Sequence, residues 1–221
     1  MAQTQAPDGT LRKDAERNRR RILDAARELY ARQGLGVTLN DVAHHAGVGV
    51  GTVYRRFRDK GQLLDELFEE QVGELVALME DGLADPDPWR GFTRYVTRNL
   101  ELQARDRAFR EILLYTPQGT ERLGQVRQRL FPLGSRLVQR AKDAGALRTD
   151  FEREDLPLLL MMLTAVVDSA QEVAPELWRR YLEVVLQGLR AAPDPPESFA
   201  TPPVRGDQVA QVMAGLKLPR R

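Results

Sequence analysis

Three glycines alternate along the segment "HHAGVGVGTVYRRF" at residues 44–57, and they are Gly47, Gly49 and Gly51. Glycines at this spacing can cradle a phosphate in a nucleotide-binding enzyme, or they can form the turn between two short helices that contact DNA. The dinucleotide fingerprint requires a preceding strand and a third glycine, whereas "TLNDVAHHA" has a helical pattern and Thr52 occupies the third position. No P-loop Gly-Lys-Ser/Thr occurs either. The glycines therefore favour a turn.

Other residues that could perform catalysis or bind metal are few. The chain has no cysteine, which excludes disulfides, cysteine-ligated zinc and thiol catalysis. The two histidines, His44 and His45, are adjacent, so on a helix they point about 100° apart and cannot chelate one metal as an i, i+4 pair does. Asp168 ends an apolar run without a catalytic partner in sequence. We expect no catalytic residue, no metal and no cofactor, and an enzyme is the least favoured alternative.

The segment before the glycines predicts a short capped helix. Thr38 precedes Asp41 by three residues, as in a capping box. One helical face is apolar and consists of Leu39, Val42, Ala43 and Ala46. Gly47 can adopt the left-handed conformation that ends such a helix. Val48 then fills the turn.

A second short helix follows the turn, and its two faces differ in character. Val53 and Phe57 are placed to bury its inner face. The exposed end and outer face comprise Val50, Gly51, Thr52, Tyr54, Arg55 and Arg56. Small residues permit close approach to DNA, while the arginines can bind phosphates or read guanine in the major groove. The pair of helices predicts a helix-turn-helix.

Charge is unevenly distributed along the 221 residues, whose formal net charge is +1. Residues 1–60 hold twelve Lys and Arg against seven Asp and Glu, which leaves the remainder mildly acidic. A basic head on an acidic body indicates a polyanion-binding module joined to another part. The run at 12–21, which includes Arg19 and Arg20, predicts either a flexible arm in the adjacent minor groove or a solvated first turn. Lys60 and Thr38 each lie where a helix N-terminus can bind phosphate.

The rest of the chain predicts helices and no sheet, because no segment alternates at period two. The expected helices cover residues 11–33, 60–82, 88–105, 106–116, 119–144, 154–172 and 175–192. Asp87 and Pro88 form an N-cap and first-turn pair, and Pro132 should kink or split its helix. The proline-rich segment 193–203 should be extended or disordered. We expect an all-α fold.

The segment "VTLNDVAHHAGVGVGTVYRRFRDKGQLL" resembles the DNA-binding head of TetR-like bacterial transcriptional regulators. The matching positions are Thr38, Asp41-Val42-Ala43, Ala46-Gly47-Val48, Gly51-Thr52-Val53-Tyr54, Phe57 and Lys60. Upstream, "RRRILDAARELYARQG" is similar to the family's first helix. Members commonly have serine where this chain has Gly49, and glycine caps less well. The resemblance covers about residues 15–68, and it implies that Thr52 and Tyr54 contact the phosphate backbone or base edges.

The resemblance also implies a domain plan. It consists of a disordered N-terminus at 1–11, a three-helix DNA-binding head at 12–60, a helical body at 61–192 and a tail at 193–221. Residues 61–82 connect head and body, and a short helix is expected at 205–217.

In this family the last two helices form a dimeric four-helix bundle, and the body holds an effector pocket. The corresponding interface candidates are Leu159, Met162, Val166, Trp178, Tyr181, Leu182 and Val185. The pocket candidates are Met79, Trp89, Phe92, Tyr95, Val96, Asn99, Leu113, Tyr115 and Met161. Each could instead be ordinary core.

The resemblance thus implies a homodimeric repressor that a small apolar or amphipathic effector releases from a palindromic operator in double-stranded DNA. The alternatives are a DNA-binding dimer without such an effector, either constitutive or controlled by a protein, and an activator. The apolar run at 156–167 is shorter than the roughly 20 residues of a membrane span, and no apolar signal segment opens the chain. We expect a cytoplasmic protein without a membrane partner.

Overall fold

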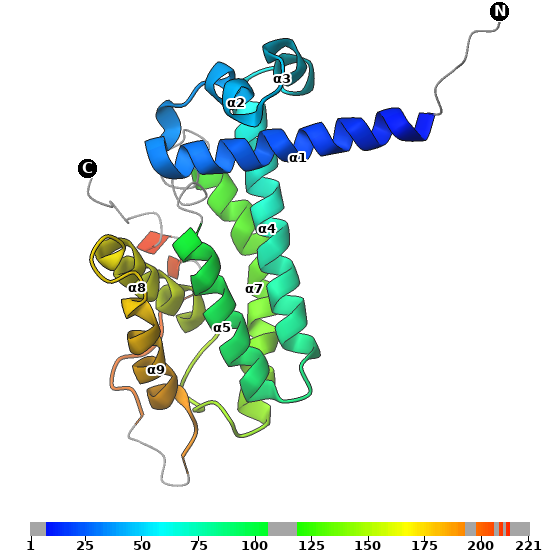
Figure 1. The fold of residues 1–221 in the computed structure, drawn as a ribbon. Coiled ribbons are helices and arrows are strands. Elements are labelled where there is room, and N and C mark those ends of the chain that lie inside the picture. The colour runs from blue at the N-terminus through cyan, green and yellow to red at the C-terminus, as the bar shows by residue number, and fades with distance from the viewer. Residues whose placement is uncertain (1–7, 106–118, 193–197, 206–207, 210, 213–221) are drawn as a thin grey trace, which may run out of the picture. The chain divides into compact units, whose positions relative to one another are not determined.

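The computed structural model describes residues 8–105, 119–192, 198–205, 208–209 and 211–212. These residues form two compact units, the first ending at Glu70 and the second beginning at Gln71 (Figure 1). The described residues are helical apart from loops and one isolated antiparallel bridge between Leu147 and Arg190. The prediction of an all-α fold is confirmed. No described helix has the length and apolar character that crossing a membrane requires.

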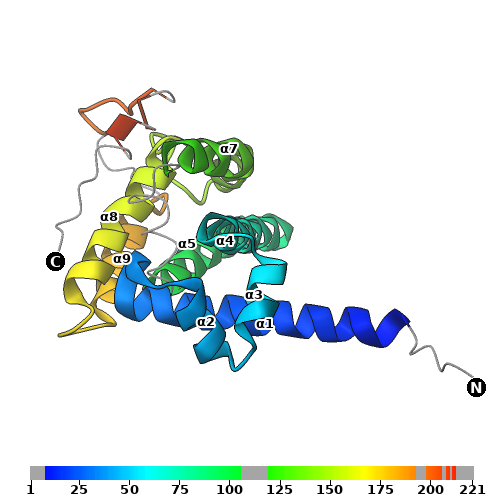
Figure 2. The same ribbon diagram turned by 90° about the horizontal axis from the view of Figure 1, so that it is seen from above.

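The first unit contains α1 (Asp8–Gln33), the 3₁₀ turn η1 (Gly34–Gly36), α2 (Leu39–Ala46), α3 (Val50–Arg56) and the start of α4 (Lys60–Ala84). α1 packs against α2, and α2 packs against α3 (Figure 2). Apolar side chains from these helices are almost completely buried and form one core, including Ile22, Tyr30, Val42, Val53, Phe57 and Leu63.

α1 begins earlier than the sequence suggested. Residues 8–11 are helical, so the prediction that they are disordered is wrong, while residues 1–7 lie outside the described residues. Ion pairs one turn apart join Arg17 to Asp14 and Arg20 to Glu16. Pairs at this spacing stabilise a helix that has few apolar residues, which accounts for the longer α1.

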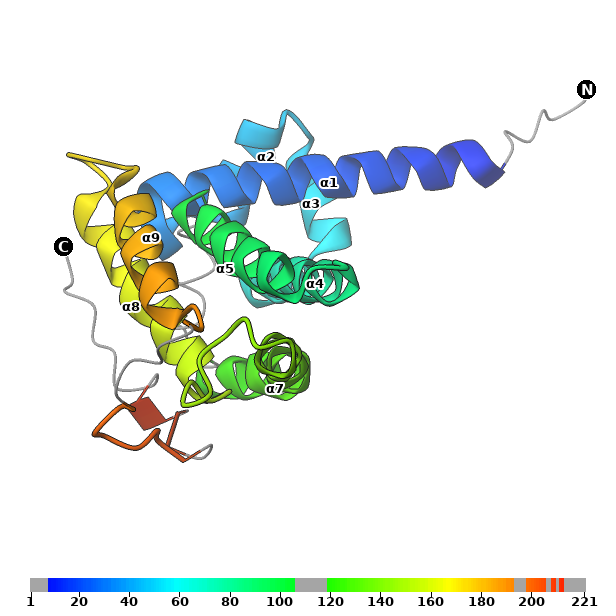
Figure 3. The same ribbon diagram turned by 90° about the horizontal axis from the view of Figure 1, so that it is seen from below.

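The second unit contains the remainder of α4, α5 (Pro88–Arg105), α7 (Gly119–Asp143), α8 (Asp155–Ala170) and α9 (Leu177–Leu189). α5 packs against α7 and α8, and α8 packs against α9 (Figure 3). The expected cap of α5 is confirmed, because the Asp87 carboxylate accepts the backbone N–H groups of Trp89 and Arg90 at 2.9 and 3.1 Å. The helix expected at 106–116 lies outside the described residues.

Pro132 does not split its helix, since α7 continues through it from Gly119 to Asp143. Pro132 is exposed, and proline removes only one N–H donor from the helix. The freed carbonyl of Gln128 therefore loses one helical partner while the helix continues on either side.

The tail attaches to the second unit. Residues 198–205 are non-helical, as expected for the proline-rich segment, and the backbone N–H of Phe199 donates to Asp150 Oδ2 at 2.9 Å. The Arg148 guanidinium lies 3.8 Å from the centre of the Phe199 ring. Within the helix expected at 205–217, the described residues 208–209 and 211–212 are helical and Val209 is buried.

Candidate nucleic-acid interface

A capping box starts α2, as the spacing of Thr38 and Asp41 predicted. Thr38 Oγ1 accepts the Asp41 N–H at 3.2 Å, and Asp41 Oδ2 accepts the Thr38 N–H at 2.8 Å. The hydrogen bond from the Thr38 hydroxyl, followed by the one from its N–H, lowers the pKa of Asp41. The predicted apolar face is also confirmed, because Leu39, Val42, Ala43 and Ala46 are buried. Thr38 therefore fixes the start of the helix while remaining exposed.

The turn after α2 depends on a glycine and on an arginine from α1. Gly47 has φ 62°, in the left-handed region, as predicted. Arg21 Nη2 donates to the carbonyl oxygen of Ala46 at 2.8 Å, so it satisfies an orphan acceptor at the end of α2. Nothing in the spacing of the basic run distinguished Arg21 from its neighbours, because its partner lies 25 residues away.

α3 presents the residues that the sequence placed on its outer face. Val53 and Phe57 are fully buried, whereas Val50 and Tyr54 are 45% and 48% exposed. Gly51, Arg55 and Arg56 are also exposed, and Thr52 is half-buried. An apolar inner face thus holds the helix on the core while a ring hydroxyl and two guanidinium groups face outward. These groups can bind phosphates or read base edges.

The two ends of this surface differ in how firmly they are fixed. Gly49, the N-cap of α3, makes no side-chain cap hydrogen bond, as its lack of a side chain requires. Lys60 begins α4, and its Nζ lies 5.7 Å from the centre of the Tyr30 ring. Burial lowers the pKa of Lys60, although the side chain is only partly enclosed. Lys60 is therefore packed on the core at the edge of the α3 surface.

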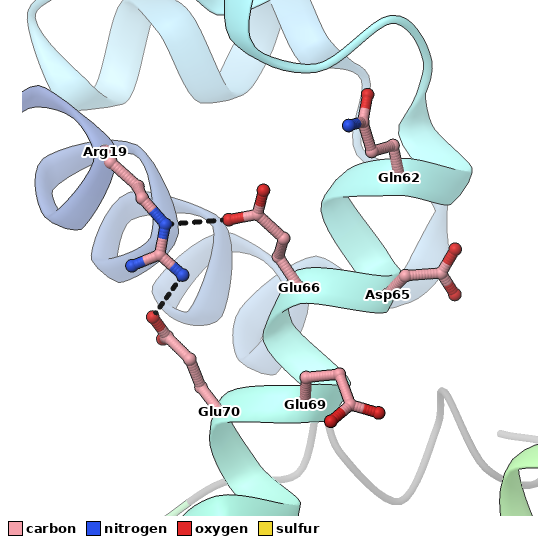
Figure 4. Close-up of a pocket in the computed structure, with 6 residues that line it drawn as sticks. All are labelled: Arg19, Gln62, Asp65, Glu66, Glu69 and Glu70. Carbon is pink, nitrogen blue, oxygen red and sulfur yellow. Dashed lines mark hydrogen bonds and ion pairs between the residues drawn. The ribbon is translucent and has the colours of Figure 1, made fainter. Parts of the chain in front are cut away.

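Arg19 corrects the prediction of a flexible arm. It lies within α1, and its Nε and Nη2 contact Glu66 at 2.8 Å and Glu70 at 3.0 Å (Figure 4). The two acidic partners lie on α4, so their distance in sequence concealed the pairing. Arg20 is exposed and pairs with Glu16 at 3.6 Å. Of the two arginines of the basic run that were proposed for DNA contact, only Arg20 retains an outward side chain.

An open pocket of about 350 Å³ surrounds Arg19, lined also by Gln62, Asp65, Glu66, Glu69 and Glu70 (Figure 4). Glu66 in addition contacts Arg56 Nη2 at 3.1 Å. Sequence reasoning missed Glu66, because only the tertiary fold brings Arg19 of α1 and Arg56 of α3 to this residue of α4.

The two adjacent histidines differ in their contacts. His45 Nε2 lies 2.8 Å from Glu28 Oε2, which joins α2 to α1, and this hydrogen bond lowers the pKa of Glu28. His44 is exposed. Across the described ranges, no group of three or more His, Asp or Glu side chains is arranged to hold a metal ion.

The effector-pocket candidates lie in the core of the second unit. Met79, Phe92, Tyr95, Val96 and Asn99 are buried, and Trp89 and Met161 are half-buried. Leu113 and Tyr115 lie outside the described residues. Asn99 Nδ2 donates to the Tyr95 hydroxyl at 3.3 Å, and burial raises the pKa of Tyr95.

Among the buried polar atoms of this unit are Asn99 Oδ1 and Trp178 Nε1, which have no hydrogen-bond partner among the described residues. Burying an unsatisfied polar group is costly, so native proteins retain few of them. These two atoms are therefore candidates for contact with a molecule that enters the core.

The interface candidates divide into core and surface. The prediction is wrong for Trp178 and Leu182, which are 1% and 4% exposed because the inner face of α9 packs into the chain's own core. Met162 and Tyr181 are 51% and 48% exposed. The remaining three, Leu159, Val166 and Val185, are half-buried against the core.

Two exposed residues of α9 were missed, Leu177 and Val184. With Tyr181 they follow the i, i+4, i+7 spacing of one helical face, so periodicity could have identified them.

Two family models match consecutive parts of the chain. Residues 22–67 match the model described as bacterial regulatory proteins, tetR family. Residues 87–191 match the model described as the C-terminal domain of SbtR-like transcriptional regulators. Together the two models cover more than half of the chain.

Individual relatives agree with these matches. A helix-turn-helix-type transcriptional regulator of Staphylococcus aureus is 43% identical over 54 residues, which span 24% of this chain and 29% of that regulator. The crystal structure of a TetR transcription regulatory protein from Mycobacterium vanbaalenii is 28% identical, with a TM-score of 0.64 over 82% of this chain and 99% of that chain. A TetR transcriptional regulator from Streptomyces coelicolor is 25% identical, with a TM-score of 0.63 over 79% and 99%.

Proposed function

The chain belongs to the TetR family of bacterial regulatory proteins, and from this premise we propose that it is a homodimeric repressor released from a palindromic operator by a small effector. Members of the family are DNA-binding transcriptional regulators rather than enzymes. The observation that carries the proposal is the outer face of α3, where Tyr54, Arg55 and Arg56 are exposed on a helix anchored by Val53 and Phe57.

A dimer is supported by the exposed apolar stripe on α9. Leu177, Tyr181 and Val184 share one face, and Met162 of α8 is also exposed. Contiguous exposed apolar side chains mark surfaces that another protein covers. A second copy of the chain would cover this stripe and supply a second head, so that two α3 helices read the two halves of a palindrome.

An effector site in the body is supported by the unsatisfied atoms Asn99 Oδ1 and Trp178 Nε1. An uncharged, largely apolar effector with one hydrogen-bonding group suits this core, because none of the described polar side chains buried there is basic. The effector must bind more tightly to a body conformation in which the spacing of the two heads does not match the operator. Only such a difference in affinity shifts the equilibrium between the DNA-binding and the released conformations. The helix that links the two units in sequence, α4, is the expected hinge.

Fluorescence anisotropy of the full chain tests the proposal. The probes are a duplex from upstream of its own gene and a scrambled duplex of equal length, each measured over a salt series. Tight binding to the first alone, with a steep salt dependence, supports sequence-specific recognition. If the protein binds both duplexes equally weakly, the assay is repeated with tiled genomic fragments. Equally weak binding to all of these fragments contradicts sequence-specific recognition.

The same assay tests the effector. We expect uncharged 1-decanol to release the operator at lower concentration than anionic decanoate of the same chain length. If decanoate is the stronger releasing agent, the effector site is not the neutral core around Asn99.

A further inference from the structure

Glu66 bridges two arginines that come from different helices of the first unit. Its carboxylate contacts Arg19 Nε of α1 at 2.8 Å and Arg56 Nη2 of α3 at 3.1 Å. The Glu66 and Arg19 side chains are only 21% and 22% exposed, whereas that of Arg56 is 45% exposed. In this triad of Arg19, Glu66 and Arg56, the Arg19 end is therefore enclosed on the core, and the Arg56 end is open on the surface of α3.

Two further contacts restrict the triad. Arg19 also contacts Glu70 at 3.0 Å, which fixes it from a second side (Figure 4). The Arg56 guanidinium lies 5.6 Å from the centre of the fully buried Phe57 ring. Arg56 thus has a carboxylate on one edge and an aromatic ring beside it, and its rotamer freedom is reduced.

Glu66 leaves most of the Arg56 donors available. A guanidinium carries five N–H donors, and the contacts to Glu66 come from Nη2. Nη2 carries two N–H groups, so the one not directed at Glu66 can still form a parallel donor pair with the N–H of Nε or of Nη1. A guanidinium held in one orientation can donate two hydrogen bonds to the O6 and N7 acceptors of guanine. Because the side chain is already ordered in the free protein, less conformational entropy is lost when DNA binds.

The pairing also distinguishes Arg56 from its neighbour. Arg55 is exposed, and in the described part of the chain no carboxylate pairs with it. Its full charge suits a phosphate, whose attraction does not depend on sequence. The charge of Arg56 is offset by Glu66, so its contribution to sequence-independent binding is smaller.

We propose that Glu66 is a positioning residue that holds Arg56 for recognition of a guanine in the operator half-site, while Arg55 serves the phosphate backbone. This role rests on the proposed function, since it requires an operator. It divides the arginine pair of α3 into one residue that selects sequence and one that supplies charge.

The experiment scans the operator for the base pair that Arg56 reads. Anisotropy is measured on the operator and on duplexes in which each half-site G·C pair is replaced by A·T in turn. We expect wild type to lose about five- to 150-fold in affinity at one such pair. Arg56→Ala should remove that discrimination and keep the salt slope, whereas Arg55→Ala should keep the discrimination and lower the slope by about 0.9 for every phosphate that is no longer neutralised.

Glu66→Gln is the direct test, and Glu70→Gln is its matched control because Glu70 contacts Arg19 but not Arg56. We expect Glu66→Gln to reduce the discrimination at that base pair about two- to fivefold and Glu70→Gln to leave it unchanged. In the Arg56→Ala background, Glu66→Gln should have no further effect. Thermal melts of the variants show whether the head remains folded.

The outcomes separate the two proposals. Absence of specific binding by wild type overturns the proposed function and this role with it. Specific binding without a G·C pair sensitive to Arg56→Ala overturns the Glu66 role alone, and this comparison does not depend on the folding of Glu66→Gln. Equal effects of Glu66→Gln and Glu70→Gln also overturn it.

Discussion

Gly82 and Gly91 face each other where α4 ends and α5 begins, and neither position has room for a side chain. A Cβ on Gly91 would lie 2.2 Å from the carbonyl oxygen of Gly82, and one on Gly82 would lie 2.9 Å from that of Gly91. Nearby, the buried Asp85 carboxylate accepts Arg90 Nη2 at 2.8 Å, which lowers the pKa of Asp85. The two helices therefore approach with backbone against backbone.

Gly91→Ala should destabilise the protein by about 1–3 kcal/mol or more, because the added methyl group meets backbone atoms that cannot move independently. The measurement is chemical denaturation. Gly73→Ala is the control, since a Cβ there meets nothing within 4 Å and alanine favours a helix. Equal stability of Gly91→Ala and wild type would show that the helices separate without cost.

Tyr54→Ala should weaken operator binding about tenfold or more without changing the oligomeric state, because alanine can neither donate a hydrogen bond to a charged phosphate group nor place a ring against the DNA. Tyr54→Phe separates the hydroxyl from the ring. Anisotropy and light scattering measure the two properties. If Tyr54→Ala binds the operator as tightly as wild type, Tyr54 does not contact DNA and only packs against the protein.

Val184→Glu should convert the dimer into a folded monomer, because a charge buried in an interface without a partner is strongly destabilising. Val184 is 60% exposed within the single chain, so the fold itself should tolerate glutamate. Val173→Glu is the control, as Val173 is 89% exposed outside the α9 stripe. A dimer that persists in Val184→Glu would place the interface elsewhere.

The tail attachment should depend on pH through Asp150. Hydrogen bonds from Arg148 and from the Phe199 N–H lower the pKa of Asp150 to about 2, against about 3.9 for an unfolded aspartate. A lowered pKa adds stability above about pH 4, and this contribution is lost as the pH falls through about 2.

Asp150→Asn should therefore be less stable than wild type at pH 7, and the difference should shrink in acid. Thermal melts between pH 7 and pH 2 measure it, with Asp143→Asn as a control, since Asp143 is exposed and accepts a hydrogen bond from the neutral amide of Gln139. A difference independent of pH would exclude the carboxylate charge as its cause.

The double variant Tyr95→Phe with Asn99→Leu should raise the melting temperature of the effector-free protein, because it removes an unsatisfied buried acceptor together with its polar neighbour. A gain of about 1 kcal/mol corresponds to about 2–4 °C for a chain of this size. Tyr95→Phe alone should lower the melting temperature, since both polar groups of Asn99 would then lack partners. A lower melting temperature for the double variant would assign this pair a purely structural role.

The sequence alone determined the features that depend on neighbouring residues. The capping box of Thr38 and Asp41, the left-handed Gly47 and the buried face of α2 all follow from interactions within a few residues. The outer face of α3 was predictable for the same reason, because helical periodicity separates Tyr54 from Val53 and Phe57. Local rules of this kind hold wherever the helices come to lie.

The tertiary structure alone decided which charged and apolar side chains meet across long stretches of chain. Arg19 contacts Glu66 across 47 residues, so a basic run that looked free for DNA includes a structural ion pair. Trp178 has the same apolar character as the exposed Tyr181, yet the packing of α9 buries it. The hydrophobic effect is non-directional, so an amphipathic helix shows only which of its residues can be buried. The elements that pack against the helix determine which of these residues are buried within one chain.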